Sequence, residues 1–323
     1  MLFRSAGADA GRGATSGYIN LSTKLPKLED ATGGTASITS ADSKRLTADV
    51  NRKIGENAAF RLNVMGQTGG VPGRDEVENS GWGIAPSLAL GLNTPTRVYL
   101  YSQHIRQDNV PDGGVPTVGL KGYYNATAAN SGSKVDSSNF YGSVNDYERV
   151  SADMFTAKVE HDWAPGSTVR NLTRYGTTTM DRIITGVNTI AAANVPSSNP
   201  STWTVPRTRQ GVDQINEILT NQTSVNTTFT TAGLKHSFVG GLELTYERQK
   251  TSTFSSTGLT IPAANLYNPN AEITLPLPYK TGAYTDGNTF SASPYASDTL
   301  ELSKYWQVDA HAGIHLPILA QLQ

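Results

Sequence analysis

The chain has 323 residues, with 26 Lys and Arg against 27 Asp and Glu, and no cysteine. A net charge of −1 indicates no nucleic-acid partner, and the absence of cysteine excludes disulfides and thiolate metal sites. No apolar run approaches the ~18 residues of a transmembrane helix, which excludes such a helix. A membrane β-barrel is not excluded, because each of its strands needs only about 9–11 residues.

Strand-like segments along the chain are joined by connections of two alternating kinds. Short turns are expected at residues 54–57, 92–95, 164–167, 231–233 and 302–304. Longer segments rich in Gly, Ser, Asn and Pro occupy about 69–79, 107–149, 176–221 and 250–296. Because the two kinds alternate, the short turns gather at one end of an antiparallel meander, an arrangement typical of outer-membrane β-barrels.

Apolar and polar side chains alternate along the segments between these connections. Phe155, Ala157 and Val159, for example, interleave with polar residues, as expected for strands. Trp163 lies beside a short turn, where an interfacial aromatic girdle would place it. Ordinary packing of aromatic residues explains it equally well, and a large soluble antiparallel sheet would show the same alternation.

A motif near the start points to a family. Residues 11–26 read Gly-Arg-Gly-Ala-Thr-Ser-Gly-Tyr-Ile-Asn-Leu-Ser-Thr-Lys-Leu-Pro. This segment resembles the one that closes the plug domain of TonB-dependent siderophore receptors, and the matching positions are Gly11, Gly13, Gly17, Ile19, Asn20 and Lys24. Residues 49–54, 59–64 and 82–88 then resemble the family's second, third and fourth strands, and residues 108–116 resemble the start of its third surface loop.

The resemblance implies an all-β fold, a transmembrane antiparallel β-barrel that in the family has 22 strands and an N-terminal plug. It also implies a receptor in the outer membrane of a Gram-negative bacterium, surrounded by outer-membrane lipid. Ferric siderophore is then the transported ligand, the inner-membrane TonB complex is the energy-supplying partner, and no cofactor is bound directly. The Gly-Tyr-Ile-Asn form of the motif favours the catecholate-type branch.

This chain departs from the family pattern at both ends. We expect residues 1–30 to be the C-terminal remnant of a plug, residues 31–308 to form about 10–11 barrel strands, and residues 309–323 to be a divergent tail. Neither a signal peptide nor the energy-coupling motif is recognisable. A truncated or decayed receptor, or a stand-alone β-sheet module for binding or adhesion, therefore stays open as an alternative.

Enzyme motifs are weak in this sequence. Gly11 and Gly13 approximate a dinucleotide-binding loop, but no buried strand precedes them and no helix start follows. His311 and His315 have a helical metal-ligand spacing, but Gly313 and Pro317 argue against a helix there. We therefore expect no catalytic residues and no metal site.

Candidate ligand residues lie in the long segments, because loops on a rigid scaffold usually carry binding residues. A ferric catecholate complex is an aromatic anion, so Arg supplies charge-assisted hydrogen bonds and Tyr or Trp supplies flat contact area. The selected candidates are Arg106, Tyr123, Tyr124, Arg182, Trp203 and Arg207, from a wider set that also holds Tyr141, Arg149, Arg209, Tyr267 and Tyr279. The alternative for each position is a residue that packs a loop or faces solvent.

Overall fold

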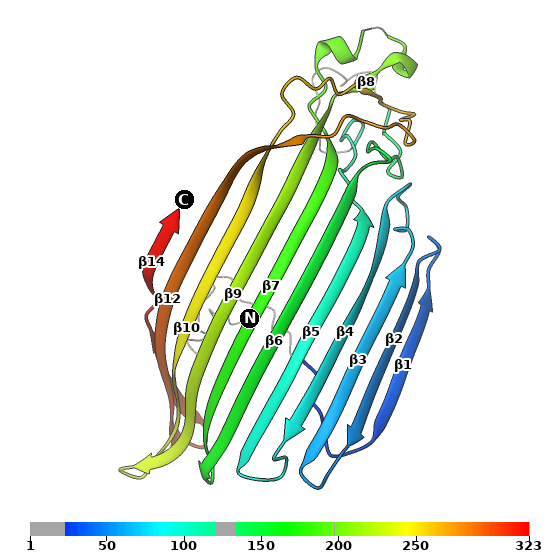
Figure 1. Cartoon of the computed structure of the whole chain (residues 1–323). Helices are drawn as coiled ribbons and strands as arrows, with labels where there is room; N and C mark the ends of the chain where they lie inside the picture. Colours follow the sequence, from blue (N-terminus) through cyan, green and yellow to red (C-terminus); the bar gives the residue numbers. More distant parts are fainter. Residues whose placement is uncertain (1–22, 121–132, 197, 323) are drawn as a thin grey trace.

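The protein is described by a computed structural model over residues 23–120, 133–196 and 198–322, and one large antiparallel sheet dominates it (Figure 1). The main strands are β1 (Ala31–Ile38), β2 (Lys44–Lys53), β3 (Ala58–Thr68), β4 (Glu78–Leu90), β5 (Thr96–Val110), β6 (Tyr147–Ala164), β7 (Ser167–Val187), β9 (Arg207–Thr231), β10 (Leu234–Ser255), β12 (Tyr279–Ser303), β13 (Trp306–Gly313) and β14 (Leu316–Leu322). Two-residue strands β8 (Thr204–Val205) and β11 (Ala264–Asn265) pair separately, and the 3₁₀ helices are η2 (Ala192–Asn194) and η3 (Pro200–Thr202).

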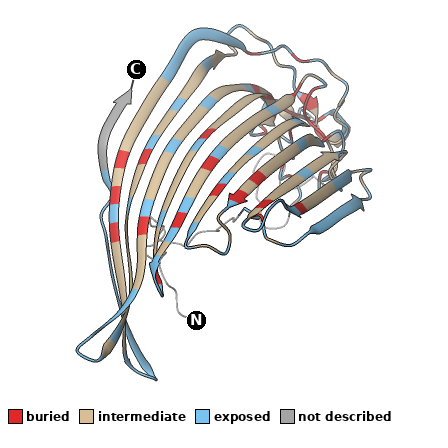
Figure 2. Ribbon diagram, turned by 60° about the horizontal axis from the view of Figure 1, so that its bottom comes forward, coloured by how far each residue is buried: buried red, intermediate tan, exposed pale blue. Residues whose placement is uncertain are grey.

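Neighbouring strands of the large sheet follow the order of the chain from β1 to β13, apart from the short β8 and β11. β13 and β14 both pair with the same edge of β12: β13 pairs with residues 295–303 and β14 with residues 287–292. Among the described residues, β1 forms one edge of the sheet and β13 and β14 the other, so the sheet curves without closing (Figure 2). The expected all-β antiparallel architecture is confirmed.

The short turns expected from the sequence all lie at one end of the sheet and the long connections at the other, where the brief link between β1 and β2 also lies (Figure 1). Gly166 and Gly233 adopt φ of 73° and 79° in two of these turns, a left-handed conformation that L side chains rarely adopt. The long connections are shorter than the sequence indicates, because β7 extends to Val187 and β9 begins at Arg207. These extensions carry polar residues on both faces, so alternation of hydrophobicity could not reveal them.

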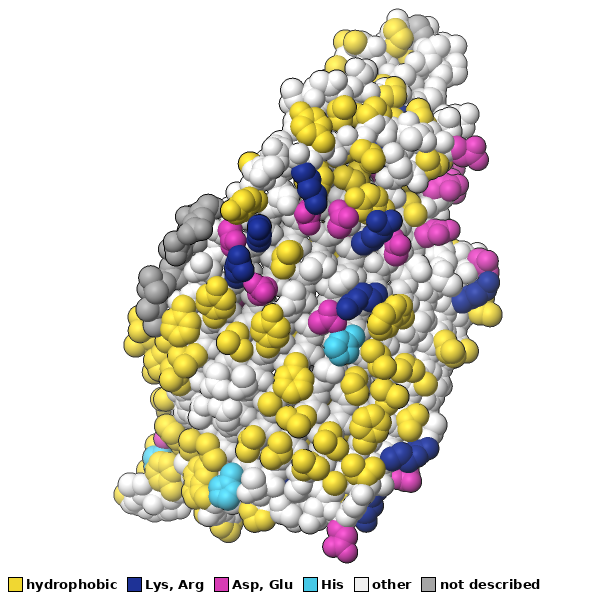
Figure 3. All heavy atoms as spheres, viewed as in Figure 1, with side chains coloured by type: hydrophobic (Ala, Val, Ile, Leu, Met, Phe, Trp, Pro, Cys, Tyr) yellow, Lys and Arg dark blue, Asp and Glu magenta, His cyan; other side chains and the backbone are white. Residues whose placement is uncertain are grey.

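The two faces of the sheet have opposite chemistry. Phe155, Tyr175, Leu219 and Tyr246 are cross-strand partners on β6, β7, β9 and β10, and 37–51% of each residue's surface is exposed. They belong to an apolar band on the convex face (Figure 3). On the concave face lie small polar residues such as Thr156, which is buried. Apolar outside and polar inside is the pattern of a wide membrane barrel.

Among the described residues, no helix is long and apolar enough to cross a membrane.

Candidate functional site

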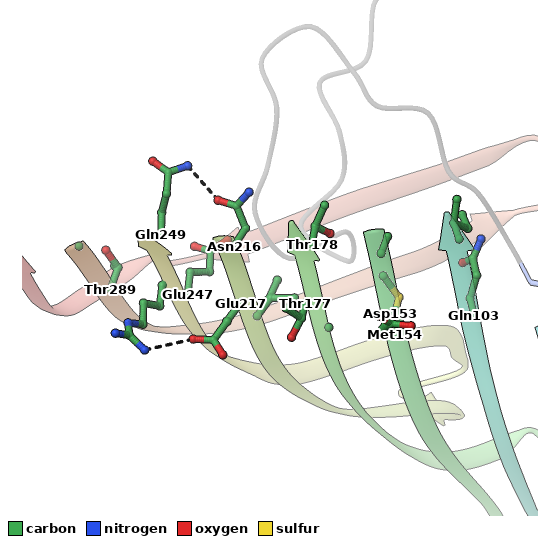
Figure 4. Close-up of a pocket in the computed structure, with 16 residues that line it drawn as sticks. Gln103, Asp153, Met154, Thr177, Thr178, Asn216, Glu217, Glu247, Gln249 and Thr289 are labelled. Atoms are coloured by element: carbon green, nitrogen blue, oxygen red, sulfur yellow. Dashed lines mark hydrogen bonds and ion pairs between the residues drawn. The ribbon is translucent and has the colours of Figure 1, made fainter. Parts of the chain in front are cut away.

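A groove of about 570 Å³ runs across the concave face at mid-height of strands β5 to β12, and both polar side chains and apolar ones such as Ile105, Met154 and Ile218 line it. Figure 4 shows Gln103, Thr178, Asn216 and Gln249 projecting into it, whereas Glu217 points to the other side of the sheet. Gln249 Nε2 donates to Asn216 Oδ1 at 2.9 Å. The groove therefore offers amide and hydroxyl groups that both donate and accept hydrogen bonds, together with the carboxylate of Glu247.

A charged row lies on the same concave face, closer to the long connections. Arg182 on β7 pairs in register with Glu148 on β6, and Arg182 Nη1 lies 3.3 Å from Glu148 Oε2. Glu148 Oε1 in turn accepts a hydrogen bond from Asn109 Nδ2 at 3.4 Å. Arg182 Nε is buried and has no hydrogen-bond partner among the described residues. This guanidinium thus lies on the concave wall with Glu148 as its counter-ion and with 30% of its side chain exposed.

The end of the plug-like motif and the residues directly after it are anchored on the concave face near β2 and β3. Lys24 Nζ lies 2.9 Å from Asp49 Oδ2, and Arg61 binds the same carboxylate through Nε and Nη2 at 2.8 and 2.7 Å. Arg61 Nη1 also donates to the Leu25 carbonyl at 3.1 Å. Asn51 continues the contact by accepting from the Lys27 backbone N–H at 3.0 Å. These side chains fix the chain where it enters the sheet.

The long connections pack on one another in a small hydrophobic core, called here the loop core. Its buried members are Val118, Val135, Tyr141, Ile190, Trp203, Val205, Ala264 and Leu266. Trp203 is 1% exposed and its ring lies 6.3 Å from that of Tyr267. Tyr141 Oη donates to the Leu266 carbonyl at 2.5 Å, and β8 pairs with β11 beside it. Connections far apart in the sequence therefore form one packed unit.

Two buried arginines tie this unit to the sheet. Arg207 donates through Nε and Nη2 to the Pro262 carbonyl at 3.0 and 2.9 Å, and through Nη1 to the Tyr141 carbonyl at 3.2 Å. Arg209 Nη2 lies 2.5 Å from Asp146 Oδ1, and Arg209 Nη1 donates to the Leu275 carbonyl at 2.7 Å. Each arginine thus joins the start of β9 to loops more than fifty residues away in sequence.

Asp146 lies at the centre of these contacts. Its carboxylate also accepts from the Thr185 hydroxyl at 2.9 Å and from the Thr185 backbone N–H at 3.1 Å. Burial raises the pKa of Asp146, while Arg209 and the Thr185 donors act in the opposite direction. A buried charge of this kind is tolerated only when it is paired and hydrogen-bonded, which is the case here.

The structure separates the candidate ligand residues into different surroundings. Arg182 faces the concave wall, but Arg106 lies on the convex face, where it pairs with Asp153 at 2.9 Å and lies 5.9 Å from the Trp82 ring. Trp203 and Arg207 are buried in and beside the loop core. Tyr123 and Tyr124 lie outside the described residues, as do motif residues Gly11, Gly13, Gly17, Ile19 and Asn20.

Reasoning from sequence did not single out Asp146 or Glu148. Both flank the start of β6 in a segment that reads as a polar loop. Only the register of β6 with β7 brings Glu148 opposite Arg182, and no local pattern encodes that register. No group of three or more potential metal ligands occurs among residues 23–120, 133–196 and 198–322.

Comparison with known proteins reveals extended similarity. The chain is 40% identical over 317 residues to the catecholate siderophore receptor Fiu of Escherichia coli O157:H7, a match that covers 96% of this chain and 41% of Fiu. It superposes on the open form of the ferric-catecholate import receptor Fiu from E. coli K12 with a TM-score of 0.90 and 39% identity, over 96% of this chain and 48% of that structure. No family model matches the sequence.

The chain is homologous to part of the TonB-dependent siderophore receptors. It is also 34% identical to a protein described as the probable TonB-dependent receptor BfrD of Bordetella pertussis, over 93% of this chain. The ferripyoverdine receptor of Pseudomonas aeruginosa shares the fold with a TM-score of 0.77 at 15% identity. The resemblance seen in the sequence is thereby confirmed, and the chain spans about 41% of the length of its curated siderophore-receptor relatives.

Proposed function

We propose that this chain forms part of an outer-membrane receptor that imports a ferric siderophore of the catecholate type. The observation that carries the proposal is the similarity to Fiu over 96% of the chain, combined with an apolar convex face and a polar concave face. The receptor carries out transport and no chemical reaction. Energy for import comes from the TonB complex of the inner membrane.

Within this proposal, the concave wall receives the ligand. Arg182 is placed to contact a ferric catecholate anion, because its side chain lies on that wall, close to the long connections, and is 30% exposed. The amides and hydroxyls of the groove below it contact the hydroxyl and amide groups of the ligand backbone. Tyr123 and Tyr124 stay candidates for aromatic contact on the basis of the sequence.

Trp203 and Arg207 take a different role in the proposal, as positioning residues. Their burial leaves little surface for a ligand, since Trp203 is 1% and Arg207 6% exposed. Both hold the loop core together, and the loop core fixes the connections that border the ligand entrance. Arg106 has no ligand role in the proposal, because it faces away from the concave wall.

Iron uptake tests this function. A bacterial strain without its own catecholate receptors should regain uptake of a ferric catecholate when it produces the complete receptor of which this chain forms part, and uptake of a ferric hydroxamate should not change. Dissipation of the proton gradient should abolish the gain, because import depends on energy from the inner membrane. Equal uptake of both iron complexes, or no gain in either, would overturn the proposed function.

A further inference from the structure

The four long connections bond to one another although they lie far apart in the sequence. They join β3 to β4 (residues 69–77), β5 to β6 (111–146), β7 to β9 (188–206) and β10 to β12 (256–278), and all lie at one end of the sheet (Figure 1). Residues 121–132 and 197 of these connections lie outside the described residues. Surface connections are usually the mobile part of a fold, and the contacts between them decide how far each can move.

Arg74 binds the β3–β4 connection to the β5–β6 connection. Its guanidinium donates through Nε and Nη2 to the two carboxylate oxygens of Asp112 at 2.8 and 2.7 Å, and through Nη1 to the Ser137 carbonyl. The next residue, Asp75, donates its backbone N–H to the Ser138 carbonyl at 2.8 Å and accepts from Ser138 Oγ at 3.1 Å. A bidentate pair between arginine and carboxylate fixes geometry as well as adding energy, and the Arg74 side chain is only 14% exposed.

The β5–β6 connection is bound in turn to the β10–β12 connection. Ser143 Oγ donates to the Ile273 carbonyl at 2.7 Å and accepts from the Leu275 backbone N–H at 3.0 Å. The Val144 backbone N–H donates to the Ile273 carbonyl at 3.2 Å, and Asn145 Nδ2 donates to the Leu275 carbonyl at 2.9 Å. Ser143 and Leu275 are 0% and 1% exposed, so water does not compete for these bonds.

The β10–β12 connection also pairs with the β7–β9 connection. Thr204 lies opposite Asn265 where β8 pairs with β11. The Leu266 backbone N–H donates to the Trp203 carbonyl at 2.9 Å, and Asn265 Nδ2 donates to the Ser201 carbonyl at 2.8 Å. With the loop core, these bonds join all four connections in a continuous series of contacts from β3 to β12.

This series restricts the motion of every member. No connection can move away without breaking bonds in a neighbouring connection, and opening at Ser143 would leave buried polar groups without partners, which is unfavourable. Segments with many buried contacts and shielded hydrogen bonds open locally at a high free energy. The four connections therefore behave as one body.

We propose that these four connections, called here the loop assembly, form a rigid border of the ligand entrance that keeps its conformation when ferric catecholate binds and while it is imported. This inference rests on the proposed receptor function. A border that is ordered before the ligand arrives removes the cost of ordering loops during binding, and so raises affinity. Arg74 is a positioning residue in this proposal, because it holds the β3–β4 connection in the assembly without contacting the ligand.

Engineered disulfides test whether the loop assembly moves. The chain contains no cysteine, so two pairs can be introduced into a cysteine-free form of the complete receptor of which it forms part. The first pair is Asp75→Cys with Ser138→Cys, whose side chains are in contact. The second is Thr204→Cys with Asn265→Cys, at directly opposite positions of two antiparallel strands. A disulfide can span such separations, and the single-cysteine variants are the controls.

We expect each oxidised pair to bind and import ferric catecholate as its reduced form does. Import that stops on oxidation and returns on reduction would overturn the proposal, because the linked connections would then have to separate. A pair that stays reduced under mild oxidation would contradict the contact between its two connections. If one pair prevents the receptor from reaching the membrane, the other gives the same decision.

Arg74→Gln tests the benefit of rigidity. Affinity for ferric catecholate should fall about fivefold, because the β3–β4 connection must then become ordered during binding. The oxidised first pair should restore the affinity of this variant, whereas no disulfide could replace a lost ligand contact. Arg149→Gln is the matched control, since the Arg149 side chain is 59% exposed beside the same connections, and it should change nothing. An unchanged affinity in Arg74→Gln, or a loss that the disulfide does not restore, would contradict the proposal.

The receptor function and the rigid loop assembly fail in different ways. If the unlinked receptor imports no ferric catecholate, the proposed function is wrong. Hydrogen exchange at the backbone N–H groups of Asp75, Val144 and Leu266 still tests the assembly in that case, because their bonds join different connections. Slow exchange at all three supports a rigid assembly, and fast exchange at any of them contradicts it.

Discussion

The Asp146 carboxylate lies 2.5 Å from Nη2 of Arg209, and the two side chains are 1% and 0% exposed. The pair joins the loop before β6 to the start of β9, and Arg209 also binds the Leu275 carbonyl in a third connection. A single ion pair therefore links parts of the chain that the sequence separates by 63 residues. Its removal should affect the long connections before it affects the sheet.

Asp146→Asn leaves Arg209 as a buried charge without a full counter-charge. Breaking a buried pair from one side costs about 3–5 kcal/mol, so the long connections should open locally. Hydrogen exchange should rise across residues 139–146 and 262–278, while the strands of the apolar band keep their protection. Asp136→Asn, at an exposed aspartate in the same connection, is the control and should change little. Equal exchange in both variants would show that the pair does not hold the loops.

Trp203→Ala should also release the loop core. Removing a fully buried Trp costs about 3–5 kcal/mol through lost packing and the cavity that remains. Limited proteolysis should then cut the long connections faster, whereas the sheet should unfold at an unchanged temperature. Val144→Ala serves as the control, because Val144 is 60% exposed in a neighbouring connection. Equal cleavage of the two variants would be inconsistent with a packed loop core.

Arg182→Gln should weaken ferric catecholate binding by tenfold or more. A hydrogen bond to a charged group contributes about 1.5–3 kcal/mol, and tenfold corresponds to ~1.4 kcal/mol. Arg106→Gln provides a matched control on the convex face and should leave the affinity unchanged. Titration followed by quenching of tryptophan fluorescence measures both. If Arg106→Gln lowers the affinity for ferric catecholate more than Arg182→Gln does, the concave wall is not the ligand-binding surface.

Gly233→Ala should lower the free energy of unfolding by about 1 kcal/mol, because φ of 79° is unfavourable for a residue with a Cβ atom. No atom lies within 4 Å of an added Cβ there, so the effect isolates backbone strain. Gly55→Ala is the matched control in another short turn, where the added Cβ meets only Ala58 Cβ at 3.7 Å. Denaturant unfolding measures both variants, and equal effects would argue against strain in the turn at Gly233.

Much of the fold can be predicted from the sequence, because local signals encode it. The short turns at 54–57 and 231–233 and the alternation in residues 155–160 indicate the strands and their up-and-down order. The orientation of Arg106 could also have been predicted, because Arg106 and the exposed Leu100 are an even number of residues apart on β5 and therefore face the same side of the sheet. Arg106 was instead placed in a long loop, where this alternation does not apply.

The loop core could not be predicted in the same way. Trp203, Tyr141 and Leu266 meet only because tertiary packing brings three connections together. Polar residues cover both faces of the extensions of β7 and β9, so these strands resemble loops in the sequence. Trp203, a candidate chosen for its chemistry alone, therefore lies buried among these residues.

Direct binding of a ferric catecholate is the most immediate test of the account. Protein purified from outer membranes is titrated with the ferric complex of a tris-catecholate, and then with a ferric hydroxamate of similar size. The account predicts saturable binding of the catecholate complex that Arg182→Gln weakens at least tenfold and that the hydroxamate does not compete with. Absence of saturable binding, or equal affinity for both complexes, would contradict it.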